Sequence, residues 1–208
     1  KTFGFILLSI GIHRWMNLHT EFISELKVKA ETDQLTGLLN RRAFIENITG
    51  EFAPKDGEGR ALLLLDIDHF KNINDQYGHS IGDETLVLFA QTIRTVLRQE
   101  DLFFRYGGEE FVVFVKNVEP EQASQVLERC RYAIESRKFP QVGKVTVSIG
   151  FSDLDAKFHT NENLLKADNA LYYIKENGRN NVLSYENLIS ENLIEPINIK
   201  DSEFDFWE

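Results

Sequence analysis

The feature that most constrains the fold is an uninterrupted apolar run, Ala61 to Leu65, which ends in the triplet Asp66-Ile67-Asp68. Consecutive apolar side chains fit a strand that is buried on both faces, because a half-exposed strand alternates apolar and polar residues. The run therefore predicts the central strand of a sheet, with carboxylates placed where the strand ends. Strand ends of this kind are common ligand sites in proteins that mix helices and strands.

The rest of the pattern mixes helices with strands. Apolar periodicity and turn residues predict helices at 41–52, from Gly82 to 97, from Pro120 onward and at 164–177, and strands at 102–105, 111–115, 145–149 and 182–185. The glycine pair between the strands at 102–105 and 111–115 predicts a tight hairpin. We therefore expect an α/β (α+β) protein with a helix-covered sheet, and not a regular doubly wound fold.

Composition limits the classes of partner. The chain has 208 residues, enough for one domain with flanking segments, and a formal net charge of -10. Sequence-independent binding to nucleic acid needs a basic surface, so no nucleic-acid partner is expected. The single cysteine, Cys130, allows no intrachain disulfide, and its place in an apolar helical stripe predicts a core residue.

The first 31 residues are predicted to form a separate helical segment. The stretch from Phe3 to Ile12 is apolar but shorter than the roughly 20 residues that cross a bilayer. Two interpretations stay open: the last turns of a membrane helix, or the end of a helix from an upstream sensory domain. We expect a cytoplasmic domain, whose full-length protein is either anchored in the inner membrane or joined to such a domain.

From Trp15 to Glu31 the pattern predicts a helix that pairs with its copy in a short coiled coil. Its apolar residues are spaced by seven: Met16, Ile23 and Ala30. At the other end, residues 186–208 are acidic and show no clear period. We predict that they form a tail, which leaves 32–185 as the domain.

The hairpin segment from Arg105 to Phe111 contains two glycines followed by two carboxylates, Glu109 and Glu110. Such a string is more often a surface turn with solvated acids. Here the glycines, Gly107 and Gly108, would let the backbone approach a ribose or phosphate closely. Glu109 is placed to join Asp66 across neighbouring strands and share Mg²⁺, which prefers oxygen ligands. The alternative for the acidic triplet is that Asp68 caps a helix starting near His69.

Two further groups of polar residues each allow a structural and a functional interpretation. Asn74, His79 and Asp83 form either a polar loop with Asp83 as an N-cap, or a pocket in which a carboxylate accepts the N1–H and N2–H of guanine. Lys175 and Arg179, four residues apart, are either favourable cations at a helix C-terminus or phosphate ligands.

Five motifs in order resemble the GGDEF-domain diguanylate cyclases over residues 33 to 185. They are Asp33 through Arg42, Asp66 through Asp83, Arg105 through Phe111, Val145 through Gly150, and Ala167 through Asn180. The resemblance implies a fold like a nucleotide cyclase or polymerase palm, with a mainly antiparallel central sheet wrapped by helices. Departures are small: Ile174 stands where alanine is usual, and Asn181 where a basic residue is common.

The resemblance also implies roles for individual residues. Asp66 and Glu109 would bind Mg²⁺, or Mn²⁺ in its place, together with the Ile67 carbonyl. Glu110 would either activate the ribose 3′-hydroxyl or hold a second metal. The GTP contacts would come from a larger set, in which Asn74 and Asp83 read guanine and the others line the ribose and triphosphate: Phe70, Lys71, His79, Gly107, Gly108, Lys175 and Arg179.

By the same resemblance, the chain would condense two GTP molecules into cyclic di-GMP and two pyrophosphates. Because each domain would hold one GTP, a homodimer is implied. Arg98 and Asp101 resemble an Arg-x-x-Asp site for inhibition by the product, and Arg129 resembles the arginine that a second domain contributes. The alternative is a catalytically silent receptor for cyclic di-GMP.

Overall fold

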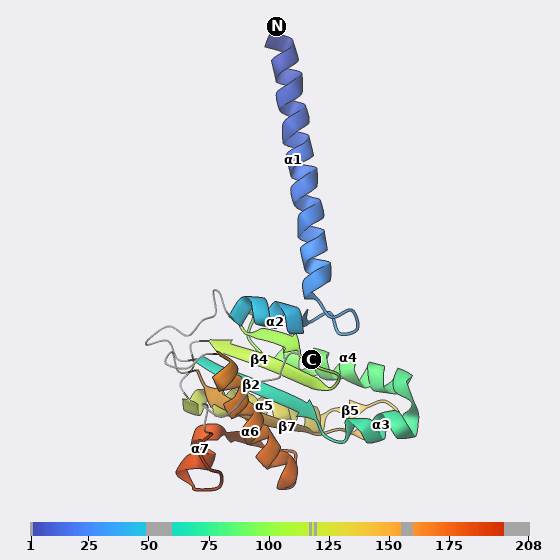
Figure 1. Cartoon of the computed structure of the whole chain (residues 1–208). Coiled ribbons are helices and arrows are strands. Elements are labelled where there is room, and N and C mark those ends of the chain that lie inside the picture. Colours follow the sequence, from blue (N-terminus) through green and yellow to red (C-terminus); the bar gives the residue numbers. More distant parts are fainter. Residues whose placement is uncertain (1, 49–59, 117, 119, 155–159, 198–208) are drawn as a thin grey trace. The chain divides into compact units, whose positions relative to one another are not determined.

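The computed structural model describes residues 2–48, 60–116, 118, 120–154 and 160–197 (Figure 1). The chain divides into two units, residues 1–32 and residues 33–208. This boundary lies within one residue of the predicted one. Among the described residues, none of the helices combines the length and the apolar character that crossing a membrane requires.

The first unit is the helix α1 (Thr2–Glu31). Its large apolar side chains from Ile12 onward are exposed: Ile12, Trp15, Met16, Leu18, Phe22, Ile23, Leu26 and Val28. The helix extends over the segment predicted to be helical and includes the stretch from Trp15 to Glu31. Pairing of this helix with a second copy stays a prediction.

The second unit is built on a six-stranded sheet in the order β1-β3-β4-β2-β7-β8. The strand β2 (Arg60–Ile67) lies in its interior and runs antiparallel to both β4 (Glu110–Lys116) and β7 (Val147–Asp153). The strand β3 (Leu102–Arg105) is antiparallel to β4, whereas the edge strands β1 (Leu39–Asn40) and β8 (Val182–Ser184) pair in parallel. The predicted central strand and mainly antiparallel sheet are therefore confirmed.

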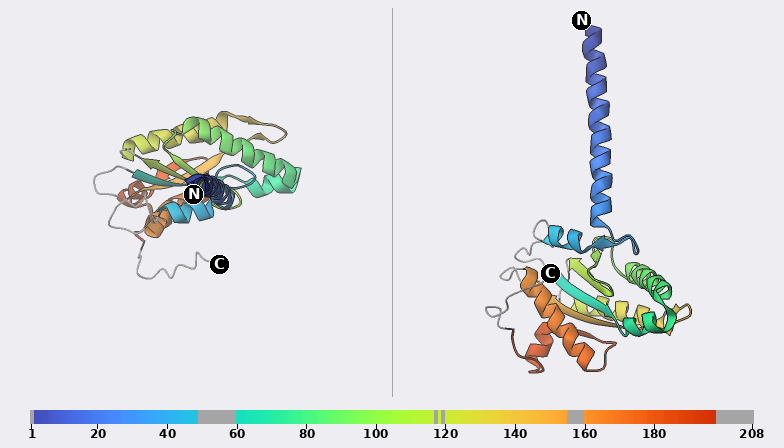
Figure 2. Two further views of the ribbon diagram at one scale, coloured as in Figure 1. Left: turned by 90° about the horizontal axis from the view of Figure 1, so that it is seen from above. Right: turned by 45° about the vertical axis from the view of Figure 1, so that its right-hand side comes forward.

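Helices cover both faces of the sheet (Figures 1 and 2). Leu63 and Leu65 of β2 belong to a core with α3 (Phe70–Tyr77), α4 (His79–Val96) and α5 (Pro120–Ser136). Leu62 and Leu64 point to the other core, shared with α2 (Arg41–Ile48) and α6 (Thr160–Glu176). Alternate side chains of β2 therefore enter different cores, which explains why its apolar run is uninterrupted.

Several boundaries differ from the sequence-based expectation. The helix expected after Gly82 begins at His79, and the helix expected from Leu164 begins at Thr160. Residues 49–52 of the helix expected at 41–52 lie outside the described residues. A two-stranded hairpin, β5 (Lys138–Phe139) with β6 (Gly143–Lys144), follows α5 and was not predicted.

The prediction of a tail from residue 186 is wrong as far as Ile197. The helix α7 (Tyr185–Ser190) follows β8, and its Leu188 is 1% exposed in a cluster with Ala170 and Tyr185. The Tyr185 hydroxyl also accepts a hydrogen bond from the Ile197 backbone N–H at 2.9 Å. A helix of six residues is too short to show a period in the sequence, so the packing of α7 on α6 decides its structure.

Gly150 of β7 fixes how closely α6 approaches the sheet. A Cβ added there would collide with the Ala167 carbonyl oxygen and the Leu171 backbone of α6. Backbone atoms cannot move aside cheaply, so the helix lies against β7 only because position 150 lacks a side chain.

We therefore predict that Gly150→Ala lowers the free energy of unfolding by at least about 1–3 kcal/mol, the usual cost of overpacking. Chemical denaturation of the whole chain measures the change. Gly108→Ala is the control, because a Cβ there meets nothing within 4 Å. Equal stability of the two variants would contradict the close contact of α6 with β7.

Candidate active site

The carboxylates predicted to act together come from the ends of neighbouring strands. Asp66 of β2 is 4% exposed and lies opposite Glu110 of β4 in the antiparallel register. The Ile67 backbone N–H donates to the Glu109 carbonyl oxygen at 3.4 Å, which continues the pairing by one residue. Strand register therefore places Asp66, Glu109 and Glu110 at one edge of the sheet.

Lys175 of α6 reaches this edge from the helix layer. Its Nζ lies 2.7 Å from Asp66 Oδ2, and its side chain is 33% exposed. This contact favours the functional interpretation of Lys175 over that of a simple cation at a helix terminus. The close packing of α6 against Gly150 helps to determine the position of Lys175.

Burial and mutual repulsion both act on these acids. Burial is the main cause that raises the pKa of Asp66, with Glu110 and Asp68 adding to it and Lys175 opposing it. Burial, followed by the Asp66 charge, likewise raises the pKa of Glu109, again against Lys175. Raised carboxyl pKa values in one place are typical of sites that receive a cation or move a proton.

Asp168 of α6 belongs to the same electrostatic cluster and received no role from the sequence. Burial raises its pKa, while Lys175 lowers it and Asp66 raises it. Asp168 lies seven residues before Lys175, which is two helical turns and hence the same face of α6. That spacing was the signal available in the sequence.

The carboxylates by themselves supply only part of the ligands that a hard divalent cation needs. Within the described residues, no three His, Cys, Asp or Glu side chains are grouped so that they could hold a metal ion. Mg²⁺ is commonly bound through one or two carboxylates, with the remaining positions filled by phosphates and waters. Asp66 and Glu109, whose pKa values are both raised by burial and by the charge of neighbouring carboxylates, fit that arrangement.

The turn between β3 and β4 is held by Arg105, whose role the sequence did not reveal. Its Nη2 donates to the Gly108 carbonyl at 2.8 Å, and its Nη1 lies 3.1 Å from Asp33 Oδ1. The Tyr106 and Gly107 backbone N–H groups donate to the Glu110 carbonyl oxygen. A Cβ at Gly107 would lie 2.6 Å from Glu110 Oε2, so the missing side chain leaves room for this carboxylate.

The proposed guanine readers lie where α3 meets α4. A Cβ at Gly82 would collide with the Asn74 side-chain amide, so Asn74 packs directly beside the residue that precedes Asp83. Asp83 is exposed and lies inside α4, whose N-cap is Gly78, so the N-cap interpretation of Asp83 is wrong. Phe70 is buried at the start of α3, and its ring tip also faces Gly82.

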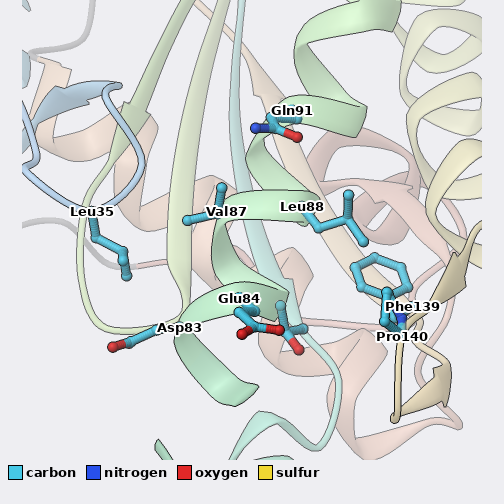
Figure 3. A pocket seen from close by; sticks show the side chains of 9 residues that line it. Leu35, Asp83, Glu84, Val87, Leu88, Gln91, Phe139 and Pro140 are labelled. Carbon is cyan, nitrogen blue, oxygen red and sulfur yellow. The ribbon is translucent and has the colours of Figure 1, made fainter. Parts of the chain in front are cut away.

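A pocket of about 360 Å³ opens beside Asp83 on the outer face of α4 (Figure 3). Leu35 lines it next to Asp83, and Val87, Leu88, Phe139 and Pro140 supply apolar walls. Two carboxylates, Asp83 and Glu84, line this largely apolar pocket, which suits a planar base that donates hydrogen bonds. Asn74 does not line the pocket.

The remaining residues expected to contact GTP are more dispersed. Lys71 on α3 and His79 at the start of α4 are exposed. Arg179 is half-buried in the turn that follows α6. The structure shows no contact of these three side chains with Asp66.

Asp68 does not cap α3, so this alternative for the acidic triplet is wrong. The N-cap residue is His69, in a left-handed conformation with no side-chain cap. Asp68 instead accepts hydrogen bonds from Thr146 Oγ1 at 2.7 Å, Ser148 Oγ at 2.6 Å and the Asn180 N–H at 3.0 Å. These bonds tie the end of β2 to β7 and to the turn after α6.

The Arg98–Asp101 segment forms a separate turn. Arg98 is exposed, whereas Asp101 is 2% exposed and accepts the Arg98 backbone N–H at 2.8 Å. Burial raises the pKa of the neighbouring Cys130 thiol to about 12, with Arg129 lowering it and Asp101 raising it. Arg129 and Asp101 thus both lie near Cys130, which is buried as predicted. Asp101 holds the turn from inside instead of facing solvent.

Comparison with known families identifies the family of the chain. The model of the family described as "Diguanylate cyclase, GGDEF domain" matches residues 30–181. The chain belongs to the GGDEF family. The resemblance of its five motifs is thereby confirmed, and it carries a domain of the diguanylate cyclase class of nucleotidyltransferases.

Curated relatives agree with this family assignment. Diguanylate cyclase DgcP of Pseudomonas aeruginosa is 42% identical over 162 residues, which are 76% of this chain and 24% of the relative. Diguanylate cyclase A of Treponema denticola is 39% identical over 81% of this chain and 45% of the relative. The chain thus spans less than half the length of these curated relatives.

Among solved structures, the coiled coil and GGDEF domain of DgcB from Caulobacter crescentus in complex with c-di-GMP superposes with a TM-score of 0.77. It is 31% identical and covers 85% of this chain and 96% of that one. The active GGEEF domain of a diguanylate cyclase from Vibrio cholerae gives a TM-score of 0.66 at 32% identity, over 71% of this chain and 97% of that one. The expected fold is therefore confirmed.

The raised pKa of Glu109 predicts a stability that depends on pH. Its pKa is higher in the folded chain than in the unfolded chain, so ionised Glu109 destabilises the fold at neutral pH. That cost disappears as the pH falls below the ordinary carboxyl pKa. We expect Glu109→Gln to raise the melting temperature at pH 7 without divalent metal, and the gain to shrink on acidification.

Thermal denaturation between pH 4 and 7 measures this effect. Adding Mg²⁺ with a GTP analogue should stabilise the wild type more than Glu109→Gln. The exposed Glu176 serves as a matched control, since Glu176→Gln should change neither result. A Glu109→Gln chain that is less stable than wild type at pH 7 would disprove the account of Glu109.

Proposed function

We propose that this chain is an active diguanylate cyclase domain, which condenses two GTP molecules into cyclic di-GMP and two pyrophosphates. The observation that carries the proposal is the meeting of Asp66, Glu109 and Glu110 at adjacent strand ends, with Lys175 on the Asp66 carboxylate. Family membership supports the reaction class. Curated relatives that are 42% and 39% identical to the chain are named diguanylate cyclases.

In this proposal the chain's residues bind one GTP and orient its reactive groups. Asp83 accepts hydrogen bonds from the guanine edge, and the neighbouring Asn74 completes the recognition. Phe70, Lys71 and His79 border the nucleotide, while Gly107 and Gly108 let the turn approach the ribose. Lys175 and Arg179 neutralise the triphosphate, which favours pyrophosphate as the leaving group.

Asp66 and Glu109, with the Ile67 carbonyl, would hold Mg²⁺ or Mn²⁺, which supplies charge neutralisation on the phosphates when bound. Glu110 faces the turn beside Gly107, where it either accepts the proton of the attacking 3′-hydroxyl or holds a second ion. Both roles require its carboxylate. An amide at position 110 would remove either one.

The reaction needs a second copy of the chain, because the attacking hydroxyl and the attacked phosphate belong to different GTP molecules. The exposed apolar side chains of α1 suit pairing with a second copy. Pairing would raise the effective concentration of one domain near the other. The domain would work in the cytoplasm, downstream of a sensory or membrane-anchored segment.

Product inhibition forms part of the proposal. Arg98 is exposed on a turn that Asp101 holds by a hydrogen bond, and it can bind guanine and phosphate of cyclic di-GMP, with Arg129 on α5 as the arginine from a second domain. Because the Asp101 carboxylate is buried, it acts by holding the turn.

The Glu110→Gln variant tests the catalytic claim. With GTP and Mg²⁺, the wild type should form cyclic di-GMP, and the variant should lose about a hundredfold or more in kcat, the usual share of a general acid–base group. Chromatography of the nucleotides measures both rates, and Glu176→Gln should match wild type. Unchanged activity in Glu110→Gln would refute the role of Glu110, whereas cyclic di-GMP binding without turnover by the wild type would favour a silent receptor.

The Arg98→Ala variant tests inhibition. Its initial rate should equal that of wild type, since the Arg98–Asp101 turn lies near Lys116, at the end of β4 opposite Glu110, but product should accumulate to a higher level. Time courses with added cyclic di-GMP measure this difference. If added cyclic di-GMP does not slow the wild type, product inhibition is refuted.

A further inference from the structure

The turn after α6 has an unusual backbone. Gly178, Arg179 and Asn180 all have positive φ values, of 112°, 62° and 47°. Glycine adopts this region freely and asparagine tolerates it, but arginine is rarely found there. A residue in such a conformation persists only where its surroundings hold it, so the contacts around Arg179 are informative.

Three backbone hydrogen bonds fix this turn. The Arg179 N–H donates to the Ile174 carbonyl at 2.9 Å, and the Asn180 N–H donates to Asp68 Oδ2 at 3.0 Å. The Asn181 carbonyl accepts the Ile149 N–H at 2.9 Å. Asp68 lies two residues after Asp66, so the turn is tied directly to the end of the strand that carries the site.

A side-chain network holds the same turn from the other side. Arg131 Nη1 on α5 donates to Asn180 Oδ1 at 2.9 Å, and Asn180 Nδ2 donates to Glu135 Oε1 at 3.1 Å. Arg131 also pairs with Glu128 and Glu135, each at 2.6 Å, and its side chain is only 13% exposed. The hydrogen bond from Arg131, together with those of Asn180 and Lys144, lowers the pKa of Glu135 to about 2. The network is therefore charged at neutral pH.

We propose that Arg131 and Asn180 are positioning residues for Arg179, and that they set the affinity of the domain for the GTP triphosphate. The guanidinium of Arg131 fixes the Asn180 side chain, and with it the left-handed turn that carries Arg179 and that Asp68 ties to the end of β2. This inference rests on the proposed function, because it assigns Arg179 to the triphosphate. Neither Arg131 nor Asn180 touches the nucleotide in this account.

A positioning role makes a specific kinetic prediction. Arg131→Met keeps an unbranched stem of similar length but removes the planar fork that holds Asn180. Arg179 would then sample other conformations, and KM for GTP would rise. The kcat at saturating GTP would fall less than KM rises, because Glu110 and Lys175 are unchanged and only the contact of Arg179 with the triphosphate is weakened.

Binding of 3′-deoxy-GTP to the whole chain, measured by calorimetry with Mg²⁺, isolates the effect from chemistry because this analogue lacks the attacking hydroxyl. We expect Arg131→Met and Asn180→Gly each to weaken binding by about tenfold, which corresponds to about 1.4 kcal/mol. Glycine accepts a positive φ, so Asn180→Gly removes the side-chain bridge and preserves the turn's allowed backbone. Arg137→Met, an exposed arginine just after α5, should bind as wild type.

The decisive experiment combines Arg131→Met with Arg179→Ala. If Arg131 acts through Arg179, Arg131→Met has no further effect on binding in the Arg179→Ala background. An equal loss in both backgrounds, or wild-type affinity in both Arg131→Met and Asn180→Gly, would overturn the proposal. A wild type that does not bind 3′-deoxy-GTP would instead refute the proposed function, and the positioning claim with it.

Discussion

The antiparallel pairing of β2 with β4 is the constraint on which the rest of the molecule depends. It places Asp66 opposite Glu110 and brings Glu109 beside Ile67. A shift of one residue would move every side chain of β2 to the other face and exchange the two cores. The alternating packing of Leu62 to Leu65 into separate cores therefore specifies the register that assembles the carboxylates.

Each further part of the site is fastened to this strand pair. Lys175 reaches Asp66 because α6 packs against Gly150 of the neighbouring strand, and the charge of Lys175 offsets the burial of Asp66. Asp68 binds the turn after α6, so Arg179 is fixed to the same strand end. Burial that raises the pKa of Asp66 and Glu109 destabilises the ionised site, as is common where a cation or substrate is to be received.

The sequence predicted the elements whose pattern lies within a few consecutive residues. The apolar run at 61–65 predicted the central strand, and the glycine pair predicted the hairpin that carries Glu109 and Glu110. It did not predict the features that depend on contacts between segments far apart in the chain. The hydrogen bonds of Asp68 to Thr146, Ser148 and Asn180 replaced the expected helix cap, and the packing of Leu188 made a helix of a predicted tail. Burial of Asp101 likewise depends on its turn against α5.

The most direct test of the central claim is whether Asp66 at the end of β2 is a metal ligand. Titration of Mn²⁺ into the whole chain with 3′-deoxy-GTP, followed by the magnetic resonance signal of free Mn²⁺, reports this binding. The account predicts that wild type and Asp75→Asn, an exposed control on α3, bind Mn²⁺ alike, and that Asp66→Asn binds it more weakly. Wild-type affinity in a folded Asp66→Asn chain would contradict the account.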